Sequence, residues 1–182
     1  MDDELLIPTE TVEPRVQESL SAQEGLPGRH YVHHEKLWLV NYPYEWTARM
    51  LADAAKCTLS VQMTLMKHGF NLKDASAYNM QFIGTKVVFI DIPSIVRTPC
   101  RNVWIALDQF YRMFLYPLLL ARCGRTSLKE YFLSNIDGME PAEVYRRFGF
   151  LGALGASLLD LWLPQQLQRF VSDKPIRKMF DG

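Results

Sequence analysis

The sequence predicts an α+β fold that is mostly helical, and three observations carry this prediction. Apolar residues recur every three or four positions over long stretches, which is the period of an amphipathic helix. Short β-rich runs gather near the middle of the chain and do not alternate with the helices, which argues against a doubly wound parallel sheet. Hydrophobic residues make up 48% of the 182 residues, enough for a core in one domain.

The composition argues against several classes of protein. The chain has 20 basic and 20 acidic side chains, so no net charge draws it to nucleic acid or to anionic lipid. Its cysteines, at positions 57, 100 and 123, are scattered and form no C-x-x-C pair, which argues against a zinc cluster and fits a cytoplasmic protein. Two apolar stretches, 110–123 and 148–163, contain charges and are shorter than the about 20 residues of a membrane span, so we expect buried helices.

The first third of the chain is predicted to lead from an irregular segment into one good helix. Residues 1–29 are polar and rich in Pro and Gly, and we expect an irregular lead-in with one short helix around 14–23. Residues 30–44 suggest one or two strands. A helix follows over 45–67, with Gly69 placed to cap its C-terminus.

The middle of the chain is predicted to form a β-hairpin. Residues 80–83 and 86–90 flank Gly84-Thr85, and Gly in the first turn position suits a type II′ turn. With that turn, Asn79 lies opposite Ile90, and Asp91 follows one step later.

The last third is predicted to be helical. A long helix over 102–122 ends near Gly124 and is kinked at Pro117. Ser127 and Glu130 form a capping box for a short helix, and Pro141 starts another. Further helix, interrupted at Pro164, is expected to about residue 171. We therefore expect a folded domain over residues 30–171 and a C-terminal tail over 172–182.

The open end of the hairpin is the candidate site. Asn79 and Asp91 are expected to meet there, with Asp74 in the preceding loop. Mg²⁺ prefers hard oxygen ligands, often one or two carboxylates completed by phosphate oxygens and water. A further carboxylate outside the metal shell can orient or deprotonate a hydroxyl. Each residue alone fits an ordinary turn as well, so the prediction depends on their combined spacing.

Two words of the sequence resemble protein kinases and small-molecule phosphotransferases. Residues 72–79, Leu-Lys-Asp-Ala-Ser-Ala-Tyr-Asn, resemble their catalytic loop, and 88–91, Val-Phe-Ile-Asp, resemble the strand that delivers the magnesium aspartate. The resemblance implies that Asp74 is the catalytic base, that Asn79 and Asp91 hold Mg²⁺, and that the fold is a kinase-like C-terminal lobe bearing these residues on its hairpin. Its departures are Leu72 for the usual histidine, Ser76 for lysine and Ile92-Pro93 for Phe-Gly, together with the lack of a glycine-rich loop and of a complete N-lobe.

A second resemblance extends over about residues 34–133. It rests on the words Tyr-Pro-Tyr-Glu-Trp (42–46), His-Gly-Phe (68–70), Asp-Ala (74–75), Tyr-Asn-Met-Gln-Phe (78–82) and Phe-Ile-Asp (89–91). These words resemble the front region of a bacterial family described as SAM-dependent methyltransferases related to the nodulation protein NoeA. The resemblance implies a kinase-like front region followed by a methyltransferase domain. The chain itself lacks the glycine-rich turn of a Rossmann methyltransferase, since the glycines at 152 and 155 stand in a helical context.

Three functions follow as hypotheses. The first is a nucleotide- and Mg²⁺-binding module of this methyltransferase-associated family, degenerate as an enzyme or lacking the methyltransferase part. It would use Mg²⁺ and ATP, with Glu45 able to reach a cofactor or to cap the helix, and SAM would require a separate methyltransferase domain or chain as partner. The second is a small-molecule phosphotransferase completed by a partner chain, and the third is a non-catalytic interaction domain. Whether the chain is an enzyme stays open: its relatives suggest a methyltransferase, and its motif suggests a phosphotransferase.

Overall fold

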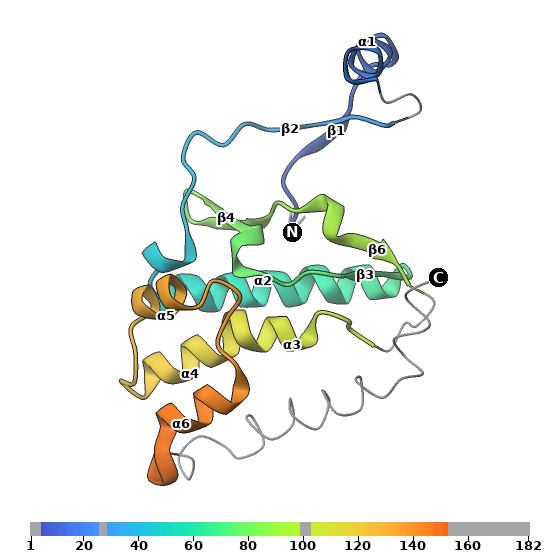
Figure 1. Ribbon diagram of the computed structural model, residues 1–182. Coiled ribbons are helices and arrows are strands. Elements are labelled where there is room, and N and C mark those ends of the chain that lie inside the picture. Colours follow the sequence, from blue (N-terminus) through green and yellow to red (C-terminus); the bar gives the residue numbers. More distant parts are fainter. Residues whose placement is uncertain (1–4, 26–28, 99–102, 153–182) are drawn as a thin grey trace.

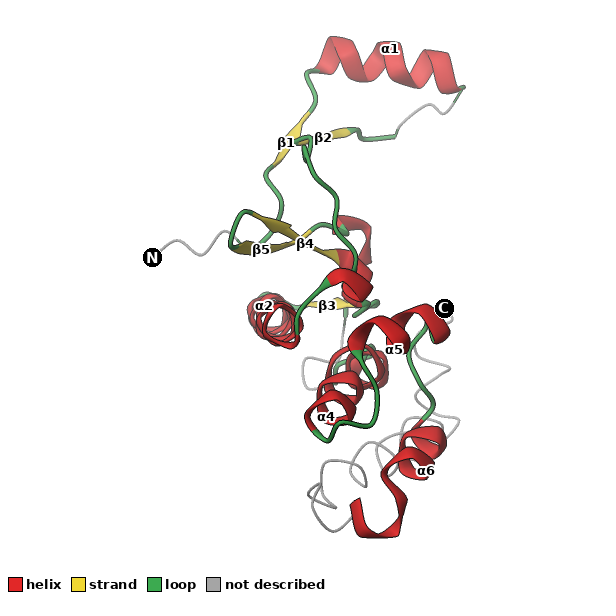
Figure 2. Ribbon diagram, turned by 90° about the vertical axis from the view of Figure 1, so that its left-hand side faces the viewer, coloured by secondary structure: helices red, strands yellow, loops and turns green. Residues whose placement is uncertain are grey.

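The structure is a computed structural model that describes residues 5–25, 29–98 and 103–152, and it has the predicted α+β composition (Figure 1). One long helix crosses the middle of the molecule. Two small sheets lie on one side of it, and the other helices lie mainly on the opposite side (Figures 1 and 2). The predicted helix up to residue 171 and the predicted tail over 172–182 fall largely or wholly outside the described residues.

The long helix is α2, Ala48–Lys67. It begins three residues later than predicted, because Pro43–Glu45 form a separate 3-10 turn (η1) and Thr47 is the N-cap, accepting a hydrogen bond from the Met50 N–H at 3.2 Å. It ends as predicted, since Gly69 has a positive φ of 79°. Its apolar face is buried against strands β3 and β5 on one side and helix α4 on the other.

The predicted hairpin is confirmed. Strand β4 (Met80–Ile83) pairs antiparallel with β5 (Lys86–Phe89), and Ile83 faces Lys86 across the turn. Gly84 has φ 63° while no other hairpin residue has a positive φ, as a type II′ turn requires. A second pair joins β3 (Phe70–Leu72) to β6 (Ile95–Arg97), so the segment between these strands forms a closed loop containing the whole hairpin.

The helix predicted over 102–122 is broken into three pieces. It begins as α3 (Leu107–Phe110), continues as one π-helical turn (η4, Tyr111–Leu115) and ends as α4 (Tyr116–Arg122), followed by Gly124 with φ 63°. The predicted kink at Pro117 is thus a change of helical period. Pro117 has no N–H and its ring crowds the carbonyl four residues before it, so the regular bonding cannot pass through this turn.

A tyrosine from the next helix joins this π-turn to the end of the fold. In α5 (Leu128–Ser134), the Tyr131 hydroxyl donates to the Arg112 carbonyl at 2.7 Å and accepts from the Met139 N–H at 2.8 Å. Gly138 packs closely against Arg112 next to this tyrosine: a Cβ added to Gly138 would lie only 2.5 Å from the Arg112 Cβ. The final described helix, α6 (Pro141–Gly152), starts at Pro141 as predicted and packs against α4.

The N-terminal segment projects from this body. Strand β1 (Thr9–Thr11) pairs with β2 (Val32–His34). Helix α1 (Pro14–Glu24), which connects them in the sequence, lies beyond the two strands and away from α2 in both views (Figures 1 and 2). We call residues 8–40 the arm. Within the described part of the lead-in the short helix was predicted, whereas the three-residue strand β1 was not. Of the strands expected over 30–44, only the three residues of β2 form one.

No helix within the described ranges combines the length and the apolar character that crossing a bilayer requires.

Candidate functional site

The open end of the hairpin brings Asn79 and Asp91 together, as the sequence predicts. The Ile90 N–H donates to the Asn79 carbonyl at 2.9 Å, which extends the β4–β5 ladder by one step. The Asn79 side-chain amide then donates from Nδ2 to Asp91 Oδ2 at 3.2 Å. Both side chains are half-buried. An amide and a carboxylate are therefore held in contact by a turn only a few residues away.

Ser94 is a third member of this group, and the sequence did not point to it. Residues Ile92–Ser94 form a 3-10 turn directly after Asp91, and the Ser94 N–H donates to the Asp91 carbonyl at 3.0 Å. The Ser94 hydroxyl donates to the same carboxylate oxygen that accepts from Asn79. Ser94 is fully buried. This turn begins with Ile92-Pro93, which stand where protein kinases have Phe-Gly, and its Ser94 hydroxyl holds the Asp91 carboxylate in place.

The loop that carries Asp74 runs next to this turn. The Lys73 N–H donates to the Ser94 carbonyl at 2.9 Å, so the loop is tied to the turn just before Asp74. Asp74 Oδ1 accepts from the Ser76 N–H at 2.8 Å, and Ser76 in turn accepts from the Tyr78 N–H at 3.2 Å. These are the local turn contacts expected of short polar side chains. They place Asp74 on the loop beside the Asp91 turn, half-exposed.

Two glutamines hold the same loop from neighbouring helices. Gln109 of α3 accepts from the Ala75 N–H at 2.8 Å. Gln62 of α2 accepts from the Leu72 N–H at 2.9 Å and donates to Asn71 at 2.8 Å. Buried backbone groups need such partners, so the loop is fixed on both sides of Asp74. The signal in the sequence is a glutamine on the apolar face of a predicted helix, which goes against the burial preference of that residue.

Glu45 serves as a cap in this structure. Its Oε2 accepts from the Tyr42 N–H at 2.8 Å, which closes the η1 turn, and its side chain is exposed. The η1 turn packs against α5. Glu45 thus caps the η1 turn, whereas the long helix that it was expected to cap has Thr47 as its N-cap. Cofactor binding by Glu45 stays a prediction.

Tyr78 contributes a protonated hydroxyl next to the hairpin. Burial raises the pKa of Tyr78, and the neighbouring Tyr44 and the charge of Asp137 raise this pKa further. Its ring contacts Phe132 edge-on at 6.3 Å between centroids. The α5 side of the site is therefore aromatic, whereas the polar contacts concentrate on the Asp91 side.

The cluster offers only two oxygen ligands for a metal ion, so the remaining ligands would have to come from a bound phosphate group and from water. Asp91 and Asn79 supply one carboxylate and one amide oxygen, both hard ligands of the kind Mg²⁺ takes. Across residues 5–25, 29–98 and 103–152, no three His, Cys, Asp or Glu side chains gather closely enough to form a metal cage. A Mg²⁺ ion held here would need phosphate oxygens and water to complete its shell.

Comparison with known proteins gives one relationship. Nodulation protein NoeA of Rhizobium meliloti (strain 1021) is 37% identical to this chain over 110 residues. The matched region is 60% of this chain and 23% of that protein, so the chain spans about a quarter of the length of this relative. No family model matches the sequence, and no solved structure matches the fold. This chain is thus related to NoeA over 60% of its own residues.

Proposed function

We propose that the chain is a kinase-like nucleotide- and Mg²⁺-binding module of the NoeA-related, methyltransferase-associated proteins. The contact between Asn79 and Asp91 at the open end of the hairpin, 3.2 Å apart, carries this proposal. The hydrogen bond from the Lys73 N–H to the Ser94 carbonyl, which ties the loop bearing Asp74 to the Asp91 turn, supports a common site for the three residues.

In this proposal Mg²⁺ arrives with the nucleotide. Bound ATP would supply the phosphate oxygens that two protein ligands leave to be filled, and the ion would offset the charge on those phosphates. Asn79 would turn its amide oxygen toward the ion, while the Ser94 hydroxyl would keep the Asp91 carboxylate oriented. Asp74 would face the hydroxyl of an acceptor and orient it, or accept its proton.

The methyltransferase association rests on the relationship to NoeA and on the family that the sequence resembles. A methyltransferase domain or chain would be the partner, and that partner would bind SAM. The relative has several times the length of the matched region, which leaves room for such a domain in the proteins of this family.

A thermal-shift titration tests the nucleotide site. We would compare Mg²⁺ alone, ATP alone and both together, on the wild-type chain and on Asp91→Asn. Asparagine keeps the shape of the side chain and one acceptor oxygen but removes the charge that the metal needs. ATP with Mg²⁺ at about 100 times the dissociation constant should stabilise the wild-type fold by about 2.7 kcal/mol, and Mg²⁺ alone should do much less.

The matched control is Asp137→Asn, which removes an exposed aspartate from the α5–α6 turn. It should retain the full Mg²⁺-dependent shift, whereas Asp91→Asn should lose it. A shift that survives in Asp91→Asn would place the nucleotide elsewhere. If the wild-type chain shows no shift, the non-catalytic interaction domain becomes the better hypothesis. Release of phosphate, if lost in Asp74→Asn, would extend the proposal to phosphoryl transfer.

A further inference from the structure

The arm has secondary structure without a core. None of its described residues, 8–25 and 29–40, is buried. Its helix α1 has 11 residues and its two strands have three residues each. Isolated helices and two-stranded sheets of this size are marginal in water, because their ordering is not offset by apolar burial. An arm with this conformation therefore needs a surface to pack against.

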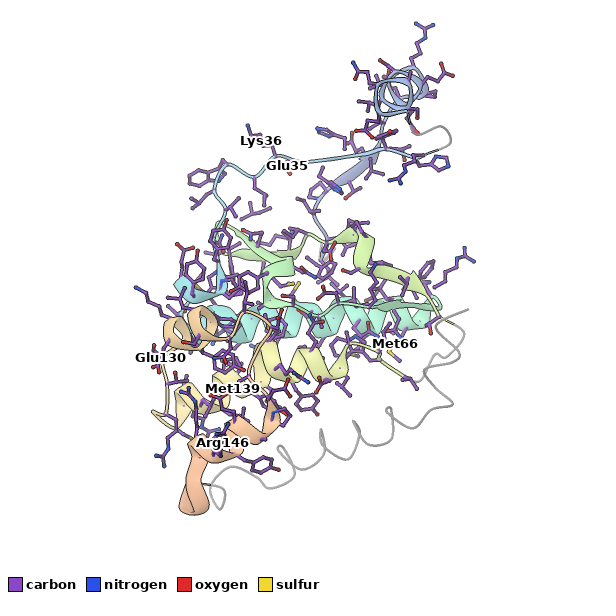
Figure 3. All side chains as sticks on the ribbon, in the orientation of Figure 1. Glu35, Lys36, Met66, Glu130, Met139 and Arg146 are labelled. Carbon is purple, nitrogen blue, oxygen red and sulfur yellow. The ribbon has the colours of Figure 1, made fainter. Side chains whose placement is uncertain are left out.

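The surface of the arm is apolar and acidic. Its exposed apolar side chains, with the exposed fractions, are Trp38 85%, Leu39 54%, Val40 51%, Val32 48% and Val16 47%. It carries five acidic and three basic side chains between residues 8 and 40. Figure 3 marks Glu35 and Lys36 on the stretch after β2, well separated from the helices of the body.

The arm is rooted firmly at both ends. At its N-terminal root the Ile7 N–H donates to the Phe89 carbonyl at 2.9 Å, and the Phe89 N–H donates to Leu5 at 2.8 Å. At its C-terminal root the Asn41 backbone and the Gln81 side chain exchange two hydrogen bonds of 3.0 and 2.9 Å. Both roots lie on the β4–β5 hairpin. The hairpin stands between the arm and α2 in both views, so the arm lies away from α2 of its own chain (Figures 1 and 2).

The outward side of α2 is also apolar, but its net charge has the opposite sign to that of the arm. Leu59 and Met63, one turn apart, are 39% and 61% exposed. Exposed basic residues flank them at Arg49, Lys56 and Lys67, with Asp53 as the acidic residue between the first two. We call this set the outer face of α2. Arg49 and Lys56 both form ion pairs with Asp53, at 3.0 and 3.1 Å, so the three basic side chains and one acidic side chain leave a net charge of +2. The outer face is therefore an apolar strip with net positive charge, and it complements the apolar arm, whose five acidic and three basic side chains leave a net charge of −2.

We propose that the arm of one chain docks on the outer face of α2 of a second copy, and reciprocally, forming a two-fold symmetric dimer. A two-fold dimer makes each such contact twice, so two weak complementary surfaces act together. The exchange gives α1, β1 and β2 the packing that they lack in the single chain. It also attaches a partner to the two strands that lead to Asn79 and Asp91.

Sedimentation velocity on the full chain measures the assembly. Across about 1 to 100 µM, a range that brackets micromolar dissociation constants, the mass should rise from 21.1 kDa toward twice that value. Higher salt should weaken the assembly, because part of the attraction is between exposed charges. Amides of α1 should gain protection from hydrogen exchange over the same concentrations. A chain that stays monomeric at the highest concentration, with unprotected α1 amides, overturns the proposal.

Three variants locate the interface. Trp38→Glu alters the arm and Met63→Glu alters the outer face of α2; each should raise the dissociation constant at least about tenfold. Leu133→Glu is the control, because Leu133 is 61% exposed like Met63 but lies on α5. It should leave the assembly unchanged. Circular dichroism should show that all three variants fold.

A mixture of two variants distinguishes exchange from other contacts. When Trp38→Glu and Met63→Glu chains are mixed, one of the two arm contacts in the heterodimer is intact, so the mixture should associate more tightly than either variant alone. If neither variant weakens a dimer, or if the mixture gains nothing, the arm does not dock on α2. Another protein is then the occupant to test against the arm.

Discussion

Replacing Tyr131 by Phe should destabilise the protein far more than the loss of one oxygen atom suggests. The Tyr131 hydroxyl serves two backbone groups, the Arg112 carbonyl at 2.7 Å and the Met139 N–H at 2.8 Å. Pro117, five residues after Arg112, has no N–H to donate to that carbonyl within the π-turn. The variant therefore leaves a donor and an acceptor without this partner in a buried region, and each such group costs about 1–3 kcal/mol. We expect a loss of about 2–4 kcal/mol in the free energy of unfolding.

Tyr116→Phe is the matched control. Tyr116 is as buried as Tyr131 and lies in the same core, but its hydroxyl has no hydrogen-bond partner. Removing an unsatisfied hydroxyl should be neutral or should stabilise the fold by up to about 1 kcal/mol. Urea unfolding followed by circular dichroism gives both values, provided that the m-value stays constant. Equal losses in the two variants, or a loss below about 0.5 kcal/mol for Tyr131→Phe, would refute the reasoning, because such small effects are typical of surface positions.

The same structure predicts two further results. Burial raises the pKa of both Tyr116 and Tyr131. The folded state therefore favours the neutral phenol. The contribution of these tyrosines to the free energy of unfolding should be complete below about pH 10, where tyrosine of the unfolded chain ionises, and should fall as the pH rises beyond it. Either Phe variant should flatten this alkaline slope when the free energy of unfolding is measured against pH. Gly138→Ala should cost about 2–4 kcal/mol, because φ is 80° and the added Cβ would lie 2.5 Å from the Arg112 Cβ and 3.0 Å from the Arg112 backbone. Gly124→Ala, with φ 63° and open space, should cost about 1–2 kcal/mol, and thermal melts would compare the two variants.

The sequence by itself determined the features that depend on near neighbours. Gly84-Thr85 fixed the hairpin register, and the register alone placed Asn79 beside Asp91, because a two-residue turn leaves the strands no other pairing. Gly69 and Pro141 likewise marked a helix end and a helix start, since their backbone preferences act locally.

Only the tertiary structure decided the contacts that join distant segments. The Lys73 N–H donates to the Ser94 carbonyl, Gln109 accepts from the loop after Asp74, and Tyr131 completes the π-turn, although nothing in the spacing of these residues indicates it. The apolar run at Trp38 suggested a strand, yet it lies exposed, because the residues before β1, Leu5 and Ile7, pair with Phe89 and not with the segment that follows β2. Periodicity states which side of an element is apolar, whereas the partner that each polar group finds depends on how the elements pack in three dimensions.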